Sequence, residues 1–189
     1  MTAVTLPLPG KLYSGLEPHK EVTGMSWGLH QFLLGLHILF ASIWVGGVLF
    51  IGWGVYPVVK KMPPSRQQTF LYALLKWSHW PLTAAGSGVI LTGFLLGTVA
   101  GPIRRWENLW RLEYGQIWLF SLILGLAVLA WGALVGYRRA MKVLGDDSLW
   151  RRAENGDTRP LMKAMRSIVL VESLEAAGFI VLICLMLLF

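Results

Sequence analysis

Two histidines lie in an apolar stretch, between Trp27 and Val59, that contains no Lys, Arg, Asp or Glu. His30 and His37 are seven residues apart, which places them on one face of a helix, about 10 Å apart along its axis. Neutral imidazole is a suitable ligand for haem iron and for copper. His37 therefore has two interpretations: a ligand to haem iron or copper, or an uncharged side chain that hydrogen-bonds a neighbouring helix.

Two carboxyl groups occur in the last apolar stretch of the chain. Glu172 and Glu175 are three residues apart and so share one helix face. One interpretation makes them neutral carboxyl groups bonded to backbone or hydroxyl groups. The other makes them a site of proton transfer or metal approach near the membrane boundary, together with His79. Because Trp77 and Trp80 flank His79, that histidine is either interfacial or a ligand.

The depths of the histidines limit how they could share a haem. Two histidines that bind one haem must lie at a similar depth on facing helices. His37 falls in one half of the expected bilayer and His79 in the other, so a haem joining these two is not expected. His30 and His37 then ligate different partners, with His30 a second ligand or a partner for a haem propionate, or His37 is the only protein ligand.

Copper sites favour soft ligands, above all for Cu(I). Of the seven Met residues only Met186 lies clearly inside an apolar stretch, and the apolar stretches contain neither a Met-x-x-Met nor a Cys-x-x-Cys motif. This pattern disfavours a thioether relay for Cu(I). It leaves open a Cu(II) site made by His37 and Glu172.

The composition predicts a membrane protein. Hydrophobic residues make up 55% of the chain and charged residues 14%, against about 25% charged in soluble domains. Each long apolar stretch exceeds the ~20 residues needed to cross a bilayer as a helix. We predict an all-α integral membrane four-helix bundle, formed by residues 27–189 after a polar extracytoplasmic tail, residues 1–26. The predicted spans are about 27–58, 69–99, 114–137 and 168–189.

The distribution of positive charge predicts the orientation. Twelve of the 17 Lys and Arg residues follow the first and third apolar stretches. The positive-inside rule then places loops 59–68 and 138–167 in the cytoplasm of a bacterial-type inner membrane and both termini outside. Because this charge is explained by topology and anionic lipid, the net charge of +7 does not indicate nucleic-acid binding.

Small and aromatic residues suggest how the spans pack. Glycine pairs at four-residue spacing, Gly93 with Gly97 and Gly132 with Gly136, are expected to let helix backbones approach each other. An aromatic belt is expected near the outer end of the third span. Its members are Trp106, Trp110, Tyr114 and Trp118.

Short motifs in three spans resemble the copper-resistance protein D (CopD)-like superfamily of four-span membrane proteins. They are Leu36-His37-Ile38 with Ile43-Trp44-Val45-Gly46-Gly47 and Phe50, then Leu91-Thr92-Gly93, and Arg166-Ser167-Ile168-Val169-Leu170-Val171-Glu172. The resemblance extends over roughly residues 30–189. The superfamily includes copper-uptake proteins and a HemJ-like branch of haem-containing protoporphyrinogen oxidases. Resemblance to that branch implies that His37 binds haem b. The branch also has a functional lysine in its third span, where this chain offers only Ser121, which argues against protoporphyrinogen oxidation.

The leading hypothesis is a haem b-binding inner-membrane protein that takes part in electron transfer, alone or as a subunit of a respiratory complex. His37 is then the axial ligand, and Glu172 and Glu175 handle protons. The first alternative is a copper-uptake or copper-resistance protein that uses His37 and Glu172. The second is a cofactor-free subunit whose basic loop anchors soluble partners. Expected partners are membrane lipid and other membrane or redox subunits.

Overall fold

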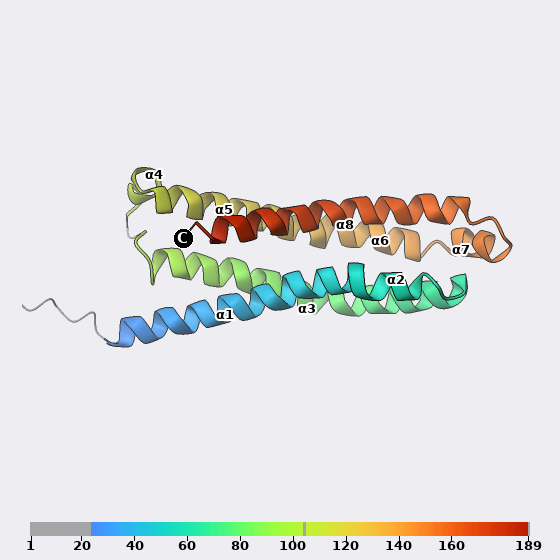
Figure 1. Ribbon diagram of the computed structural model, residues 1–189, viewed down its shortest axis with the longest axis horizontal. Helices are drawn as coiled ribbons and strands as arrows, with labels where there is room; N and C mark the ends of the chain where they lie inside the picture. Colours follow the sequence, from blue (N-terminus) through green and yellow to red (C-terminus); the bar gives the residue numbers. More distant parts are fainter. Residues whose placement is uncertain (1–23, 104, 189) are drawn as a thin grey trace, which may run out of the picture.

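The computed structural model describes residues 24–103 and 105–188, and every regular element within them is helical. Four long antiparallel rods form the bundle (Figure 1). The first rod runs continuously through α1 (Gly24–Leu49), the π-helix η1 (Phe50–Val55) and α2 (Tyr56–Val59). The second rod is α3 (Pro64–Thr98). The predicted all-helical fold is confirmed.

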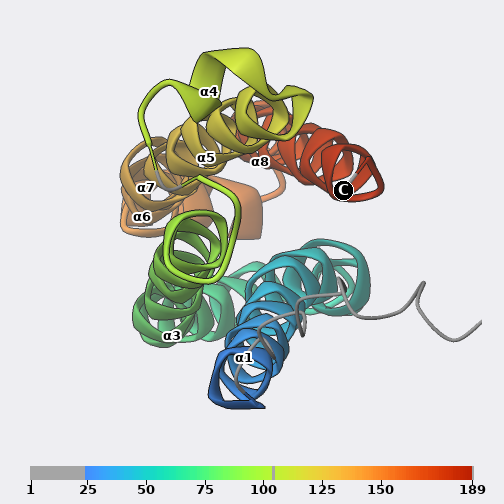
Figure 2. The same ribbon diagram turned by 90° about the vertical axis from the view of Figure 1, so that its left-hand side faces the viewer.

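The other two rods complete the bundle. The third rod joins α5 (Glu113–Ala130), the π-helix η2 (Trp131–Gly136) and α6 (Tyr137–Leu144), and the fourth is α8 (Arg159–Met186). The short helices α4 (Asn108–Arg111) and α7 (Asp147–Glu154) lie in the connections at opposite ends. Seen along the bundle, α1 lies beside α3 and α5 beside α8, and the two pairs meet along α3 and α5 (Figure 2).

All four rods are long and apolar enough to cross a membrane, so the chain is a multi-pass membrane protein with four candidate spans. The rods contain 33, 35, 32 and 28 residues, more than the ~20 that the hydrocarbon requires. Exposed tryptophans support two interfaces. Trp27, Trp106 and Trp110 are exposed at one end, and Trp53, Trp77 and Trp80 are exposed further along the bundle.

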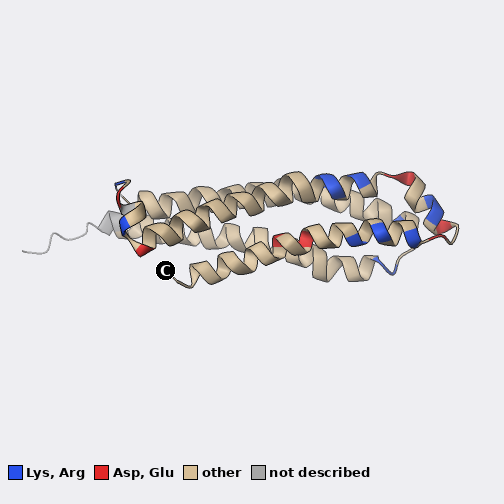
Figure 3. Cartoon of the chain, turned by 90° about the horizontal axis from the view of Figure 1, so that it is seen from above, with Lys and Arg blue, Asp and Glu red and all other residues tan. Residues whose placement is uncertain are grey.

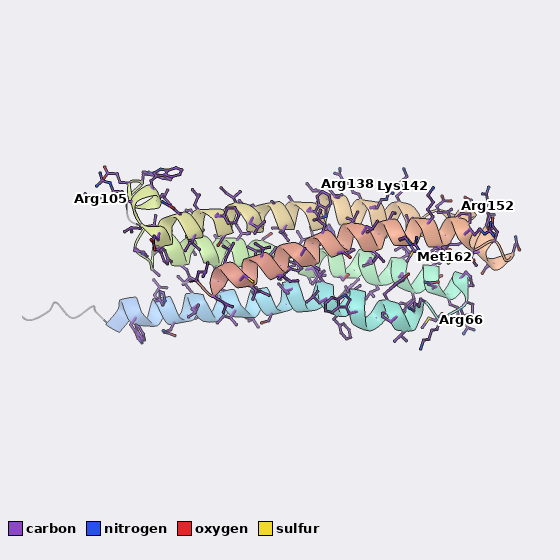
Figure 4. The ribbon with its side chains drawn as sticks, turned by 45° about the horizontal axis from the view of Figure 1, so that its top comes forward. Arg66, Arg105, Arg138, Lys142, Arg152 and Met162 are labelled. Carbon is purple, nitrogen blue, oxygen red and sulfur yellow. The ribbon has the colours of Figure 1, made fainter. Side chains whose placement is uncertain are left out.

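Positive charge gathers at one end of the bundle, here named the basic end (Figure 3). Arg66, Arg138, Lys142 and Arg152 lie toward this end, whereas Arg105 lies at the opposite end (Figure 4). Residues 138–167, predicted as the connection between the third and fourth spans, are largely helical, because α6, α7 and the start of α8 occupy most of them. Gly145 ends α6, and Gly156 after α7 has a left-handed φ of 96°.

A hydrophobic cluster closes the basic end and explains why that segment is helical. Residues of α7 pack there with residues of all four rods, and the side chains of Trp150, Leu144 and Val59 are fully buried. The indole Nε1 of Trp150 donates to the carbonyl of Val143 (3.1 Å). We call this group the end cluster; its buried members are Val59, Leu71, Val143, Leu144, Trp150, Ala153, Leu161 and Met165.

The cap of α7 holds that helix across the bundle end. The Asp146 carboxylate accepts from the backbone N–H and the hydroxyl of Ser148 (3.1 and 2.6 Å). The hydrogen bond from the Ser148 side chain holds the pKa of Asp146 below its usual range. The cap is therefore present at neutral pH and is lost only in acid, as the pH falls through this lowered value.

One buried residue from each rod forms a second cluster near the middle of the bundle. This central cluster consists of Trp44, Ala85, Val128 and Phe179. The rings of Trp44 and Phe179 meet edge to face with centroids 5.0 Å apart, which joins the first rod to the fourth.

The prediction that Trp118 belongs to the outer aromatic belt is wrong, because its side chain is buried between rods. Its indole Nε1 donates to the carbonyl of Gly93 (3.0 Å), and the ring fills the space left by the absent side chain of Gly97. The Gly93–Gly97 pair therefore receives side chains, His37 and Trp118, rather than a helix backbone.

We predict that Trp150→Ala lowers the free energy of unfolding by about 3–5 kcal/mol, because it empties the centre of the end cluster and removes a buried hydrogen bond. Unfolding by a denaturing detergent in mixed micelles, followed by circular dichroism, measures the change. Trp106→Ala is the control, since that indole is 85% exposed. Equal losses in the two variants would contradict the assigned role of the end cluster.

Candidate functional site

A cavity of about 480 Å³ lies inside the bundle, lined by residues of all four rods. Its limits along the bundle axis are the two clusters. Trp44 of the central cluster lines one end, and Leu71, Leu144 and Met165 of the end cluster line the other. Apolar packing therefore closes the cavity in both directions along the membrane normal.

The cavity opens on the flank of the bundle, between the first and fourth rods. Trp53 on η1 and Val169, Ser173 and Ile180 on α8 line the cavity and are also exposed. On the side of α3 and α6 the rings of His79 and Tyr137 stack with centroids 3.8 Å apart and planes 14° from parallel. Access is thus sideways, through the flank of the bundle rather than along its axis.

Glu172 and Glu175 both line this cavity from α8. Glu175 is only 5% exposed, and Glu172 is half-buried. Two glycines on the third rod make room for them. A Cβ on Gly132 would overlap Oε1 of Glu175, and one on Gly136 would lie 2.9 Å from Oε1 of Glu172. Each carboxyl group thus occupies the place of a missing side chain on the facing helix.

Both π-helices border the cavity. The segment η2 carries Gly132 and Gly136, and η1 contributes Ile51, Gly52 and Trp53 to the lining. A π-turn inserts one extra residue into a helical turn and is often found at functional sites, because it redirects side chains locally. Here the two π-helices shape two walls of one cavity.

The two carboxyl groups have no partner in the described part of the chain. Neither forms a hydrogen bond or an ion pair there, and no Lys or Arg lines the cavity. The nearby hydroxyls of Ser78 and Ser173 instead donate to carbonyls of their own helices. Because a buried charge is costly without a partner, protons or a bound molecule must balance this pair, here named the acid pair.

His37 lies outside the cavity, between α1 and α3. Its Nδ1 is 3.0 Å from Oγ1 of Thr92, whose hydroxyl is itself 2.7 Å from the carbonyl of Gly88. Because threonine has one hydroxyl proton and donates it to Gly88, its oxygen accepts from Nδ1–H of the histidine. This network assigns the tautomer and leaves Nε2 as a lone-pair donor for hydrogen or metal.

The sequence-predicted residues fall into two groups. His79, Glu172 and Glu175 meet at the cavity, as expected for a shared site, whereas His30 and His37 do not line it. Trp44 and Leu129 both contact the Cβ position of Gly86 and so mark one depth. His37 lies seven residues from Trp44 in one direction, and Gly136, beside Glu172, lies seven from Leu129 in the other. His37 and Glu172 are therefore about 20 Å apart along the bundle.

Residues near His37 suit a haem iron ligand in their chemistry. The hydrogen bond at Nδ1 orients the ring, as partners of metal-ligating histidines do. The hydroxyl of Ser121 is buried without a hydrogen-bond partner among the described residues. Ser121 lies one turn from Trp118, which contacts the same Gly93 as His37, so its depth is similar. The cavity itself does not reach His37 and does not provide a porphyrin site on that histidine.

A compact metal site does not form around the acid pair. The described residues hold no group of three or more His, Cys, Asp or Glu side chains that could bind one ion. His79 lines the same cavity as the two carboxyl groups without completing such a group.

Comparison of the chain with protein-family models, with curated proteins and with solved structures found no match. The resemblance to CopD-like proteins therefore stays a prediction.

Gly132, Gly136 and Thr92 are the site residues that the sequence analysis did not assign. The available signal was the pairing of two acidic residues in one span with two small residues in another. Two small residues at this spacing can leave room for side chains of a facing helix as well as for close approach of its backbone.

We predict that a lipid-soluble carbodiimide, which reacts with protonated carboxyl groups, modifies Glu175 in the folded protein. Gly132→Ala should reduce this labelling severalfold, because the new methyl group occupies the space beside Gly132 that the carboxyl group now fills. Peptide mass spectrometry gives the yield. Gly35→Ala is the matched control, since a Cβ there meets nothing within 4 Å. Unchanged labelling in Gly132→Ala would show that the space beside Gly132 does not position Glu175.

Proposed function

We propose that this chain is a membrane electron-transfer component in which the cavity binds a lipid-soluble quinol or quinone and the acid pair exchanges its protons. The observation that carries the proposal is the unpartnered Glu175 in a cavity closed at both ends and open on the flank of the bundle. This arrangement suits a molecule that arrives through the bilayer and either gives up or takes up protons.

Size and lining support this class of substrate. Typical small-molecule pockets have volumes of about 300–1,000 Å³, an apolar lining and a few convergent polar groups. The cavity of about 480 Å³ fits that description, with the acid pair, His79 and Tyr137 as polar groups on mainly apolar walls. A quinone ring with part of its isoprenoid chain has the same distribution of polarity.

The chemistry assigns the chain's residues simple roles. Oxidation of a quinol releases two protons and two electrons. In their ionised form Glu172 and Glu175 would accept these protons as general bases, and their burial limits competition from water. The electrons require a one-electron acceptor of the haem or iron–sulfur class.

His37 is the candidate ligand for that acceptor. Its Nε2 would hold the iron of a haem b, which supplies one-electron redox chemistry. The specific support is the Thr92–Gly88 network, which leaves Nε2 unprotonated, and the unpartnered hydroxyl of Ser121 at similar depth. His30 lies one heptad nearer the start of α1, about 10 Å from His37 along the same helix, and is therefore proposed as a propionate partner rather than a second ligand of the same haem.

The other two functions have less support. Copper uptake through His37 and Glu172 would need two stations about 20 Å apart, with the central cluster between them. No contact favours a cofactor-free anchor. Following the positive-inside rule, we propose that the basic end faces the cytoplasm. We also propose that the membrane is a bacterial-type inner membrane.

We predict that a short-chain quinone binds the protein in nanodiscs and that Glu175→Gln weakens binding at least about tenfold, since it removes the proton-exchanging group. Equilibrium binding of a radiolabelled quinone measures this. Glu154→Gln is the control, because Glu154 is exposed on α7 and outside the cavity. Equal affinities for wild type, Glu175→Gln and Glu154→Gln would contradict quinone binding at the acid pair.

We predict that the protein produced with an adequate haem supply shows a reducible Soret and α-band pair and that His37→Ala abolishes it. Thr92→Val should keep the ligand but weaken haem retention by about 10–100-fold, because it removes the group that orients His37. Absorption spectra and a pyridine haemochrome assay measure both. His30→Ala, which removes the proposed propionate partner, should reduce haem retention and leave the absorption bands in place. Bands that persist in His37→Ala would rule out this ligand.

A further inference from the structure

The carboxyl groups that line the cavity have no basic side chain beside them to balance a negative charge. Two carboxyl groups line it, and no Lys or Arg does so. Glu175 is 95% buried, lines the cavity and has no hydrogen-bond or ion-pair partner in the described part of the chain. Protons balance this charge when the cavity is empty of other cations. A bound cation would balance it equally well.

Aromatic side chains line the same space. Trp53 and Tyr56 contribute from the first rod and Trp44 from the central cluster. Aromatic faces attract cations, and the attraction grows where water is excluded. The ring of Tyr137 is already stacked on His79, so the aromatic side chains of the first rod are the ones available to a bound molecule.

From these observations we propose that the cavity also binds lipophilic organic cations, such as amines or quaternary ions with bulky apolar substituents, in exchange for protons on the acid pair. This inference uses the cavity of the proposed function and does not depend on electron transfer. The proton balance is simple: each singly charged cation that enters releases one proton from a protonated carboxyl group, and no bond other than O–H is broken.

The closed ends of the cavity select this class over inorganic ions. A hydrated metal ion that approaches along the bundle axis meets the end cluster or the central cluster, both of which are apolar. It would also meet two carboxyl groups without the third close ligand that a compact site needs. A lipophilic cation dissolves in the bilayer interface and reaches the flank opening beside Trp53 directly.

The other titratable groups that line the cavity influence the response of the acid pair to pH. They are Tyr56 on α2, His79 on α3 and Tyr137 on α6, and no Lys or Arg lies among the lining residues. Because protons and the cation compete for the same carboxyl groups, cation affinity should rise with pH until the acid pair is fully ionised.

The test uses tetraphenylphosphonium as the cation and tetraphenylborate as an anion of the same size and shape. Equilibrium dialysis against the full chain in nanodiscs should show saturable binding of tetraphenylphosphonium only, with release of one proton per cation. We expect Glu172→Gln with Glu175→Gln to weaken binding at least about tenfold, and Glu154→Gln to leave it unchanged. Equal binding of the two ions, or full affinity in the double variant, would overturn the inference.

A second measurement needs no variant at all. Tetraphenylphosphonium should protect Glu175 of the wild-type protein from the lipid-soluble carbodiimide, and tetraphenylborate should not. Lack of protection would place the cation elsewhere and overturn the inference. Quinone binding without cation binding would remove this inference and leave the proposed function. Cation binding without quinone binding would remove the proposed function and leave this inference.

Discussion

The bundle is built around the burial of a carboxyl pair that has no fixed counter-charge. An isolated buried charge is unstable, so a site of this kind persists only where the surrounding packing accommodates it. Gly132 and Gly136 provide the space, and the two clusters exclude water along the axis. The acid pair is thereby placed where its charge can change only by exchange of protons or of a bound molecule.

The π-helices border the same cavity. Along η2, Gly132 lies opposite Glu175 and Gly136 opposite Glu172. The two glycines, four residues apart on the third rod, thus lie beside two glutamates that are three residues apart on the fourth. The second π-helix, η1, lies on the open side and contributes Trp53 to the mouth.

Hydropathy and charge were sufficient to predict the helical fold with four long apolar stretches, because lipid allows few other arrangements of the backbone. The same signals missed the helices of 138–167, since α6 and α7 are short and amphipathic and bury residues such as Leu144 and Trp150 only through tertiary packing. The contact of His37 with Thr92 was equally beyond sequence reasoning. It depends on the relative height of two helices, which apolar spans do not encode locally.

The central cluster divides the molecule into two chemically different halves. On one side His37 has a fixed tautomer and one uncommitted nitrogen; on the other, the acid pair faces an opening to the bilayer. Trp44 and Phe179 close the space between them with apolar rings, which block the passage of hydrated ions and protons. Electrons require no such path through water. Under the proposed function, the apolar layer between the imidazole and the two carboxyl groups would let electrons pass toward one membrane face while protons stay at the other.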